Sequence, residues 1–153
     1  MPSSQSRTIV QVSNAAEGKV TSFLVWFGCD VSKFFHRPSG VLDTNLFDYK
    51  LTFGIDLNLN KADRLRYGES SMAHAMTLTG VDLKDGIPRK WRVENSWGDE
   101  NGDKGYLCMS DDWFNEYMYQ IVVQKADLEE EVLRVLDQQP IALPPWDPMG
   151  TLA

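Results

Sequence analysis

The chain has 153 residues, of which 42% are hydrophobic and 24% are charged, and its formal net charge is −7. A chain of this length and composition forms about one globular domain, which excludes wholesale disorder. The negative charge and the lack of a basic stripe argue against a nucleic-acid partner, because binding to a duplex depends on Lys and Arg contacts to phosphate. We interpret the acidity as a contribution to solubility; an acidic docking surface is the alternative.

Signals for membrane insertion, secretion and disulfide bonding are missing from the sequence. The longest apolar run covers residues 23–27, far fewer than the roughly 20 residues that a membrane-spanning helix needs. The N-terminus lacks the apolar segment of a secretory signal. Cys29 and Cys108 are too few for a disulfide framework, so we expect two reduced thiols. We therefore expect a cytoplasmic protein that does not contact a membrane.

The first third of the chain predicts one buried strand between less regular segments. Residues 1–21 are polar and weakly patterned, and we expect a loosely ordered terminal segment with one short strand over residues 8–12. Residues 22–31 are rich in aromatic and β-branched side chains, which predicts a buried strand. The turn residues that follow indicate a loop with apolar anchors. Residues 51–57 then predict another strand.

The middle of the chain predicts a short helix and a three-stranded meander. Asn60 is suited to cap a helix over residues 61–68, which ends at a glycine. Residues 71–83, 89–97 and 105–109 read as three strands, separated by two segments of turn-forming residues. Strands joined by tight turns pair with their neighbours, so these three are expected to form one antiparallel sheet.

The last part of the chain predicts two helices, a strand and a tail. Residues 111–119 open with Asp residues suited to a helix start, and residues 120–125 read as a strand. Residues 126–138 form an amphipathic pattern. Its apolar side consists of Leu128, Val132, Val135 and Leu136. The proline-rich end is neither helix nor central strand, although Trp146 and Met149 indicate that it docks.

Together these elements predict an α+β fold built on an antiparallel sheet or open barrel with short helices. We divide the chain into a divergent segment over residues 1–21, a folded part over residues 22–139 and an extended tail over residues 140–153.

Two histidines are the candidate acid–base groups, and one of them has a promising neighbour. His74 lies among small and apolar residues, where it is either a satisfied interior group or a poised base. Asn95 follows it across one tight turn, so the two side chains can lie opposite each other. An Asn oxygen that accepts from one ring N–H fixes the tautomer and leaves the other nitrogen for a nucleophile. Trp97, on the same face, can shield that hydrogen bond from water.

The stretches HAMTLTGV, KWRVENSWG and KGYLCM resemble the histidine and asparagine motifs of the papain-like cysteine peptidases. Within this class the chain resembles the bleomycin hydrolase family over about residues 22–153, including VWFGCDV and the end PPWDPMGTLA. The resemblance implies the C-terminal antiparallel β-barrel half of the fold and a cysteine-type aminopeptidase that hydrolyses peptide or aminoacyl substrates. It implies that His74 partners the catalytic thiolate, Asn95 orients His74, and Trp97 covers their hydrogen bond.

The sequence departs from the family at the nucleophile. Papain-like enzymes carry it in an N-terminal helical half, in a Gln-x-x-x-x-x-Cys-Trp stretch that this sequence lacks. Asp30 is expected to raise the pKa of the Cys29 thiol, and Cys108 lies in a predicted strand, so we expect structural roles for both cysteines. We expect a truncated product or an alternative start. The alternative function is a catalytically inactive interaction module that assembles with full-length subunits, since the family forms homohexamers.

The tail carries a further implication of the resemblance. In bleomycin hydrolases the C-terminus lies in the active-site cleft, which implies that Gly150, Thr151, Leu152 and Ala153 approach the N-terminus of the substrate. A terminal carboxylate held there would pair with the substrate ammonium; the alternative is a flexible end. We expect His36 to be solvated or packed. Two isolated histidines give no metal site, and no cofactor is expected.

Overall fold

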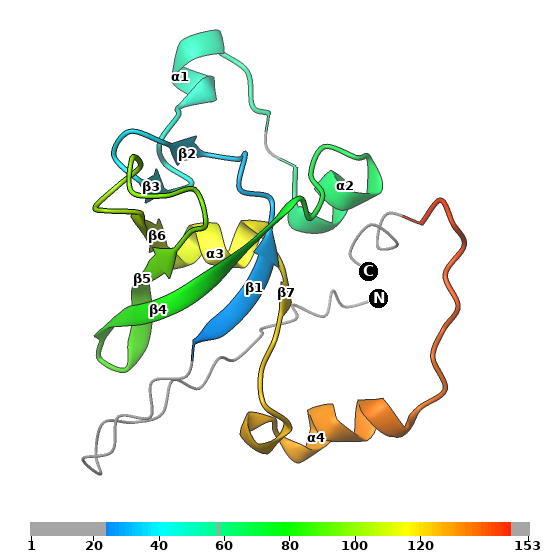
Figure 1. Ribbon diagram of the computed structural model, residues 1–153. Helices are drawn as coiled ribbons and strands as arrows, with labels where there is room; N and C mark the ends of the chain where they lie inside the picture. Colours follow the sequence, from blue (N-terminus) through cyan, green and yellow to red (C-terminus); the bar gives the residue numbers. More distant parts are fainter. Residues whose placement is uncertain (1–23, 58, 148–153) are drawn as a thin grey trace, which may run out of the picture.

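The computed structural model describes residues 24–57 and 59–147, which form a curled sheet with short helices (Figure 1). The strands are β1 (Val25–Cys29), β2 (Phe35–His36), β3 (Val41–Leu42), β4 (His74–Lys84), β5 (Ile87–Glu94), β6 (Tyr106–Ser110) and β7 (Met118–Ile121). The helices are α1 (Tyr49–Phe53), α2 (Lys61–Arg66), α3 (Asp111–Tyr117) and α4 (Glu130–Leu133), with 3₁₀ turns η2 (Lys125–Asp127) and η3 (Arg134–Asp137).

The seven strands form one sheet in the order β2-β3-β6-β5-β4-β1-β7. The predicted α+β half-barrel is confirmed, and the sheet is mixed because β3 and β6 run parallel. The predicted meander is also confirmed: β4, β5 and β6 pair antiparallel in chain order. Asp85 and Gly86 join β4 to β5 with φ values of 54° and 78°. Two positive φ values in a two-residue turn match the twist of the flanking strands.

One face of the sheet forms the core, and α3 covers it. Alternate residues of the central strands point to this face. The buried strand residues there include Phe27, Met76, Leu78, Trp91, Val93, Leu107 and Met109. The hydroxyl of Ser110 accepts from the Trp113 backbone N–H and caps α3, whose buried side chains pack on this layer. Burial of each large apolar side chain stabilises the fold by about 1.5–3 kcal/mol.

The strand predicted over residues 51–57 is wrong, because α1 forms over Tyr49–Phe53. Apolar residues alternate with other residues along this stretch, which is the pattern of a strand. Local capping overrides the pattern: the Asp48 carboxylate accepts from the Leu51 backbone N–H, and Gly54 ends the helix with a φ of 70°. The apolar side chains are therefore exposed, and Leu51 has 83% of its surface accessible.

The predicted helix after Asn60 is confirmed as α2. The Asn60 side chain accepts from the Asp63 backbone N–H, and Gly68 has a φ of 70° just beyond the helix. Arg64 fixes α2 to α3, because its guanidinium donates to the Glu116 carboxylate and lies 4.8 Å from the Tyr117 ring centroid. The helix is thereby anchored through a side chain that is 9% exposed.

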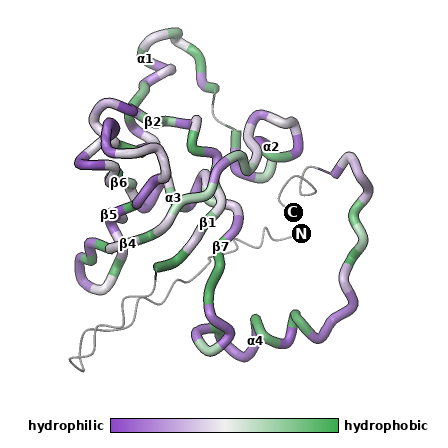
Figure 2. The backbone as a smooth tube through the Cα atoms, viewed as in Figure 1, coloured by the Kyte–Doolittle hydropathy of each residue, from purple (hydrophilic) through white to green (hydrophobic). Residues whose placement is uncertain are grey.

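The C-terminal elements differ from their predicted limits. The strand predicted over residues 120–125 begins earlier, as β7. The amphipathic helix predicted over residues 126–138 is broken into η2, α4 and η3. This stretch lies apart from the sheet (Figure 1). Hydrophobic and hydrophilic residues alternate along it (Figure 2). Val135 and Leu136 are 57% and 60% exposed, because no element of the described residues covers them.

Trp146, expected to dock, is 83% exposed. The strand predicted over residues 8–12 and the tail residue Met149 lie outside the described residues. None of the helices in residues 24–57 and 59–147 is long and apolar enough to cross a membrane.

A close backbone contact fixes β3 and the loop before β6. Gly40 and Gly102 have φ values of 65° and 66°, and a Cβ added to Gly102 would lie 2.2 Å from the Tyr106 carbonyl oxygen. Gly54 also has a φ of 70°, but a Cβ there meets nothing within 4 Å.

We expect Gly102→Ala to lower the free energy of unfolding by about 3 kcal/mol, because the methyl group forces the backbone apart. The matched Gly54→Ala should cost only about 1 kcal/mol, the penalty of a left-handed L residue. Urea denaturation monitored by circular dichroism measures both values. Equal effects of the two substitutions would contradict the close contact.

Candidate active site

His74 and Asn95 lie at the same rim of the sheet because of strand register. His74 begins β4 and continues the buried row of Met76 and Leu78. Asn95 follows the end of β5 and continues the row of Val93, which pairs with Leu78. Side chains two residues apart share a face. The pairing therefore places both polar side chains on the core face, where the apolar layer ends.

The two side chains form a hydrogen bond whose donor and acceptor can be assigned. Nε2 of His74 lies 2.8 Å from Oδ1 of Asn95. The backbone N–H of Ser96 also donates to this Oδ1, at 2.8 Å, so the atom is the amide oxygen and an acceptor. Nε2 therefore carries the proton and donates it. In a neutral ring Nδ1 is then the basic nitrogen, and it has no hydrogen-bond partner among the described residues.

Trp97 lies against the imidazole, as the sequence pattern predicts. The two ring centroids are 4.7 Å apart, with an interplanar angle of 35°. The Asn95 backbone N–H donates to the Gly105 carbonyl at 3.4 Å and ties the loop to the start of β6. Nδ2 of Asn95 is buried and has no acceptor in the part of the chain that the structure describes. The indole thus excludes water from one side of a partly buried polar pair.

Sequence reasoning missed a second layer around Trp97. The Arg37 guanidinium carbon lies 4.7 Å from the Trp97 ring centroid and 6.0 Å from that of Phe35. No sequence pattern signals this contact, because the turn between β2 and β3, which carries Arg37, is brought to the loop after β5 by the parallel pairing of β3 and β6. His36 is exposed, and its Nδ1 lies 2.7 Å from the Ser39 hydroxyl, in agreement with a solvated role.

Cys29 lies next to His74 but is not available as a nucleophile. The two Cα atoms are direct partners in the β1–β4 pairing. The Cys29 side chain is 0% exposed, and no hydrogen bond joins it to His74 among the described residues. Burial, followed by the charge of Asp30, raises the pKa of the Cys29 thiol to about 12. The expected effect of Asp30 is thereby confirmed, and the thiol is neutral near pH 7.

Cys108 is exposed but lies on the other face of the sheet. Its neighbours Leu107 and Met109 point into the core. The register places Cys108 beside Arg92 and then Gly80, and His74 begins the strand roughly 20 Å from Gly80. Cys108 therefore cannot reach the imidazole.

An apolar hollow of about 440 Å³ adjoins His74. It is lined by Trp26, Phe27, Gly28, Met72, Ala73, His74, Ala75, Gln120 and Val122. A Cβ at Gly28 would lie 2.1 Å from the Met72 sulfur. The glycine therefore lets Met72 lie directly on β1, and the hollow keeps a flexible apolar wall.

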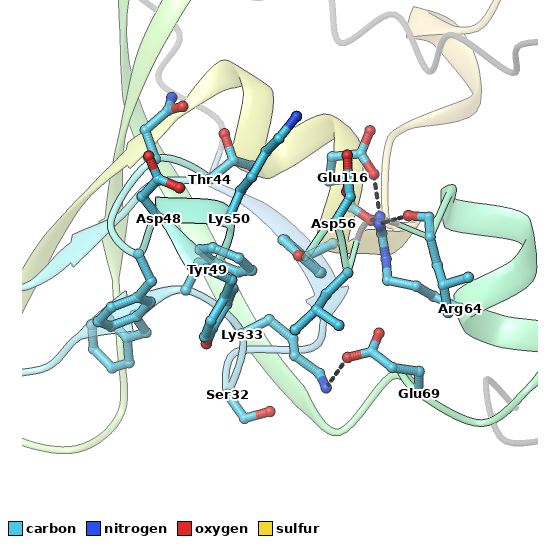
Figure 3. Close-up of a pocket in the computed structure, with 17 residues that line it drawn as sticks. Ser32, Lys33, Thr44, Asp48, Tyr49, Lys50, Asp56, Arg64, Glu69 and Glu116 are labelled. Carbon is cyan, nitrogen blue, oxygen red and sulfur yellow. Dashed lines mark hydrogen bonds and ion pairs between the residues drawn. The ribbon is translucent and has the colours of Figure 1, made fainter. Parts of the chain in front are cut away.

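A larger cavity of about 1310 Å³ lies away from His74, between the segment around α1 and helices α2 and α3 (Figure 3). Four charged side chains of its wall form two ion pairs, Lys33 with Glu69 at 2.7 Å and Arg64 with Glu116. No group of three or more His, Cys, Asp or Glu residues that could hold a metal occurs in residues 24–57 and 59–147.

Comparison with known proteins assigns the class. The model of the Peptidase C1-like family matches residues 10–150, and the chain belongs to this family of cysteine peptidases. A crystal structure of PepW from Lactobacillus rhamnosis HN001 superimposes with a TM-score of 0.77 and 50% sequence identity. The match covers 83% of this chain and 29% of that one, and it confirms the papain-like fold.

The relatives narrow the assignment further. Bleomycin hydrolase of Homo sapiens is 59% identical over 133 residues, which cover 84% of this chain and 29% of that protein. Aminopeptidase C of Lactobacillus delbrueckii subsp. lactis is 53% identical over 133 residues, covering 85% and 30%. The chain thus spans less than a third of the length of these relatives and matches their C-terminal part. The predicted resemblance to the bleomycin hydrolase family is confirmed.

We expect the folded chain to react with iodoacetamide at pH 8 only at Cys108. Cys29 should stay unmodified, because its thiol is inaccessible and its pKa of about 12 leaves almost no thiolate; the thiolate fraction rises only as the pH approaches that value. Mass spectrometry of the Cys108→Ser variant isolates the Cys29 reaction, and denatured protein is the positive control. Rapid modification of Cys29 in the folded variant would contradict the assignment of Cys29 as structural.

Proposed function

We propose that this chain supplies the histidine–asparagine half of a bleomycin hydrolase-like cysteine aminopeptidase site. The observation that carries the proposal is the 2.8 Å hydrogen bond from His74 Nε2 to Asn95 Oδ1, with Trp97 packed against the imidazole. Asn95 orients the ring without adding charge, so the ring can become an imidazolium beside a thiolate. Membership of the cysteine peptidase family supports the same roles.

The proposed reaction is acyl transfer to a thiolate. The sulfur forms a bond to the peptide carbonyl carbon, and the C–N bond breaks as the His74 imidazolium gives its proton to the leaving amine. Nδ1 then takes a proton from water, whose oxygen attacks the thioester and releases the acid and the thiolate. Asn95 keeps Nε2–H engaged throughout, so that Nδ1 carries both proton transfers.

The thiolate in this proposal comes from a polypeptide segment outside the given sequence. Cys29 is buried with a raised pKa, and Cys108 lies on the far face of the sheet. A site assembled from two parts explains why the rim of His74 and Asn95 carries no nucleophile of its own. A reducing compartment such as the cytoplasm would keep that thiol active.

The substrates proposed are peptides or aminoacyl amides, hydrolysed from the N-terminus. The family resemblance supports a role for Gly150, Thr151, Leu152 and Ala153, which lie outside the described residues. Their terminal carboxylate would pair with the α-ammonium of the substrate and limit cleavage to the first residue. The apolar hollow beside His74 would accept an apolar group on the acyl side of the scissile bond.

A chimera tests the catalytic proposal. In it, this chain replaces the matching C-terminal part of human bleomycin hydrolase, which supplies the thiol. We expect hydrolysis of aminoacyl-coumarin substrates that a thiol alkylator abolishes. His74→Ala should lower kcat by at least about 1000-fold, and Asn95→Ala by about tenfold to a hundredfold, the value of one charge-assisted hydrogen bond.

His36→Ala is the matched control, because this exposed histidine bonds only to Ser39, and it should leave kcat unchanged. The chain without the added part should show no hydrolysis. An active chimera that keeps its rate after His74→Ala would refute the assigned role, and activity of the isolated chain that alkylation removes would assign the nucleophile to Cys29 or Cys108.

A second candidate function is a catalytically inactive module that binds full-length subunits of the family as a homo-oligomer does. The observation that favours it is the exposed apolar surface around α1, where Leu51 and Phe53 are 83% and 63% exposed. Tyr49 and Ile55 of the same segment are also exposed, at 40% and 54%, and contiguous exposed apolar residues mark interaction surfaces.

If this second function holds, the chain should bind a full-length relative in size-exclusion chromatography with light scattering. Replacing both Leu51 and Phe53 by Ser should weaken the binding at least about tenfold, because each buried apolar side chain contributes about 1.5–3 kcal/mol. Leu83→Ser, at the far end of β4 and 50% exposed, is the control. Unchanged affinity of the double variant would exclude this surface.

A further inference from the structure

An arginine lies on the aromatic surface next to the histidine–asparagine pair. The Arg37 guanidinium carbon and the His74 imidazole centroid each lie 4.7 Å from the Trp97 ring centroid. The guanidinium carbon is therefore within about twice that distance of the imidazole. Arg37 thus belongs to the surroundings of the proposed reaction, although it does not touch His74.

Arg37 has no anionic partner of its own. It is exposed, and no ion pair or side-chain hydrogen bond joins it to another described residue. Its contacts are the ring faces of Trp97 and Phe35. A guanidinium packed against an aromatic face keeps its N–H donors in its own plane and free for a ligand. The rings therefore hold a positive fork in place without neutralising it.

The chemistry of the proposed reaction identifies the anion that would bind the Arg37 guanidinium. A general acid gives its proton to the leaving amine, so the leaving part of the substrate lies against His74. In a short peptide the α-carboxylate is on that leaving part, whereas the acyl part of an aminopeptidase substrate ends in an ammonium group. A carboxylate binds a guanidinium through two parallel N–H···O bonds.

The distance sets the length of the leaving part. A peptide spans at most about 3.3–3.6 Å per residue. The gap from imidazole to guanidinium is at most twice 4.7 Å. Less a hydrogen bond of about 2.9 Å at each end, it is filled by a leaving part of one residue.

We propose that Arg37 binds the C-terminal carboxylate of the leaving part and makes dipeptides with a free carboxylate the preferred substrates. This inference rests on the proposed peptidase function and adds a specificity-determining residue to it. The apolar hollow whose lining includes His74 would then take the acyl part.

A binding experiment tests the carboxylate site without turnover. The full chain, labelled with ¹⁵N, is titrated with Leu-Gly and with Leu-Gly-amide, which differ only in the carboxylate. We expect Leu-Gly to shift the signals of the Arg37 Nε–H and the Trp97 indole N–H, and Leu-Gly-amide to shift them at least about tenfold less at equal concentration. Arg37→Gln should remove the difference between the two ligands.

Arg89→Gln is the matched control. Arg89 is exposed near the start of β5, whereas Asn95 follows the end of this strand. Arg89→Gln therefore removes the same charge at a position away from the proposed carboxylate site. It should behave as the wild type. Arg37→Lys, which keeps the charge but loses the planar fork, should retain only part of the preference. Equal shifts by both ligands, or a preference that survives Arg37→Gln, would overturn the proposal.

A kinetic experiment separates this inference from the proposed function. In the chimera, Arg37→Gln should lower kcat/KM for Leu-Gly by at least about tenfold and leave it unchanged for an aminoacyl-coumarin, whose leaving group has no carboxylate. A chimera inactive on every substrate would contradict the peptidase function, whereas the binding titration would still decide the carboxylate site. An active chimera in which Arg37→Gln affects both substrates equally would overturn the specificity role alone.

Discussion

The pairing of Leu78 on β4 with Val93 on β5 is the constraint on which the rest of the site depends. Both side chains are buried, and the residues that follow the same alternation toward the rim are His74 and Asn95. A slip of one residue would turn one of these polar groups to the opposite face. Burial of the apolar rows fixes the register of the two strands. The register in turn holds His74 and Asn95 within the 2.8 Å of their hydrogen bond.

The rim is completed by loops that the sheet brings together. The parallel pairing of β3 with β6 and the close approach of Gly40 to Gly102 place the turn between β2 and β3 beside the loop after β5. Trp97 and Arg37 meet there. His74 also belongs to the lining of the apolar hollow formed mainly by residues of β1 and of the start of β4. The histidine is therefore shared by an aromatic and cationic group of side chains and by an apolar one.

Sequence patterns failed where local capping or the lack of a packing partner decided the structure. Alternating apolar residues predicted a strand over residues 51–57, yet the Asp48 cap and Gly54 made a helix of the first part. A strand needs a neighbour for its backbone groups, whereas one helical turn satisfies its own. The apolar side of the pattern over residues 126–138 likewise stays exposed in the part of the chain that the structure describes, and short helical turns formed instead of one helix.

The sequence by itself determined the meander, the helices after Asn60 and Ser110, the family, and the encounter of His74 with Asn95, because these depend on short-range turns and on the period of buried residues. Only the tertiary structure decided that Cys29 lies directly opposite His74 and is nevertheless sealed in the core, and that Arg37 stacks on Trp97. Such contacts join segments far apart in the chain. Their distances follow from the packing of the whole sheet, which no local pattern of residues records.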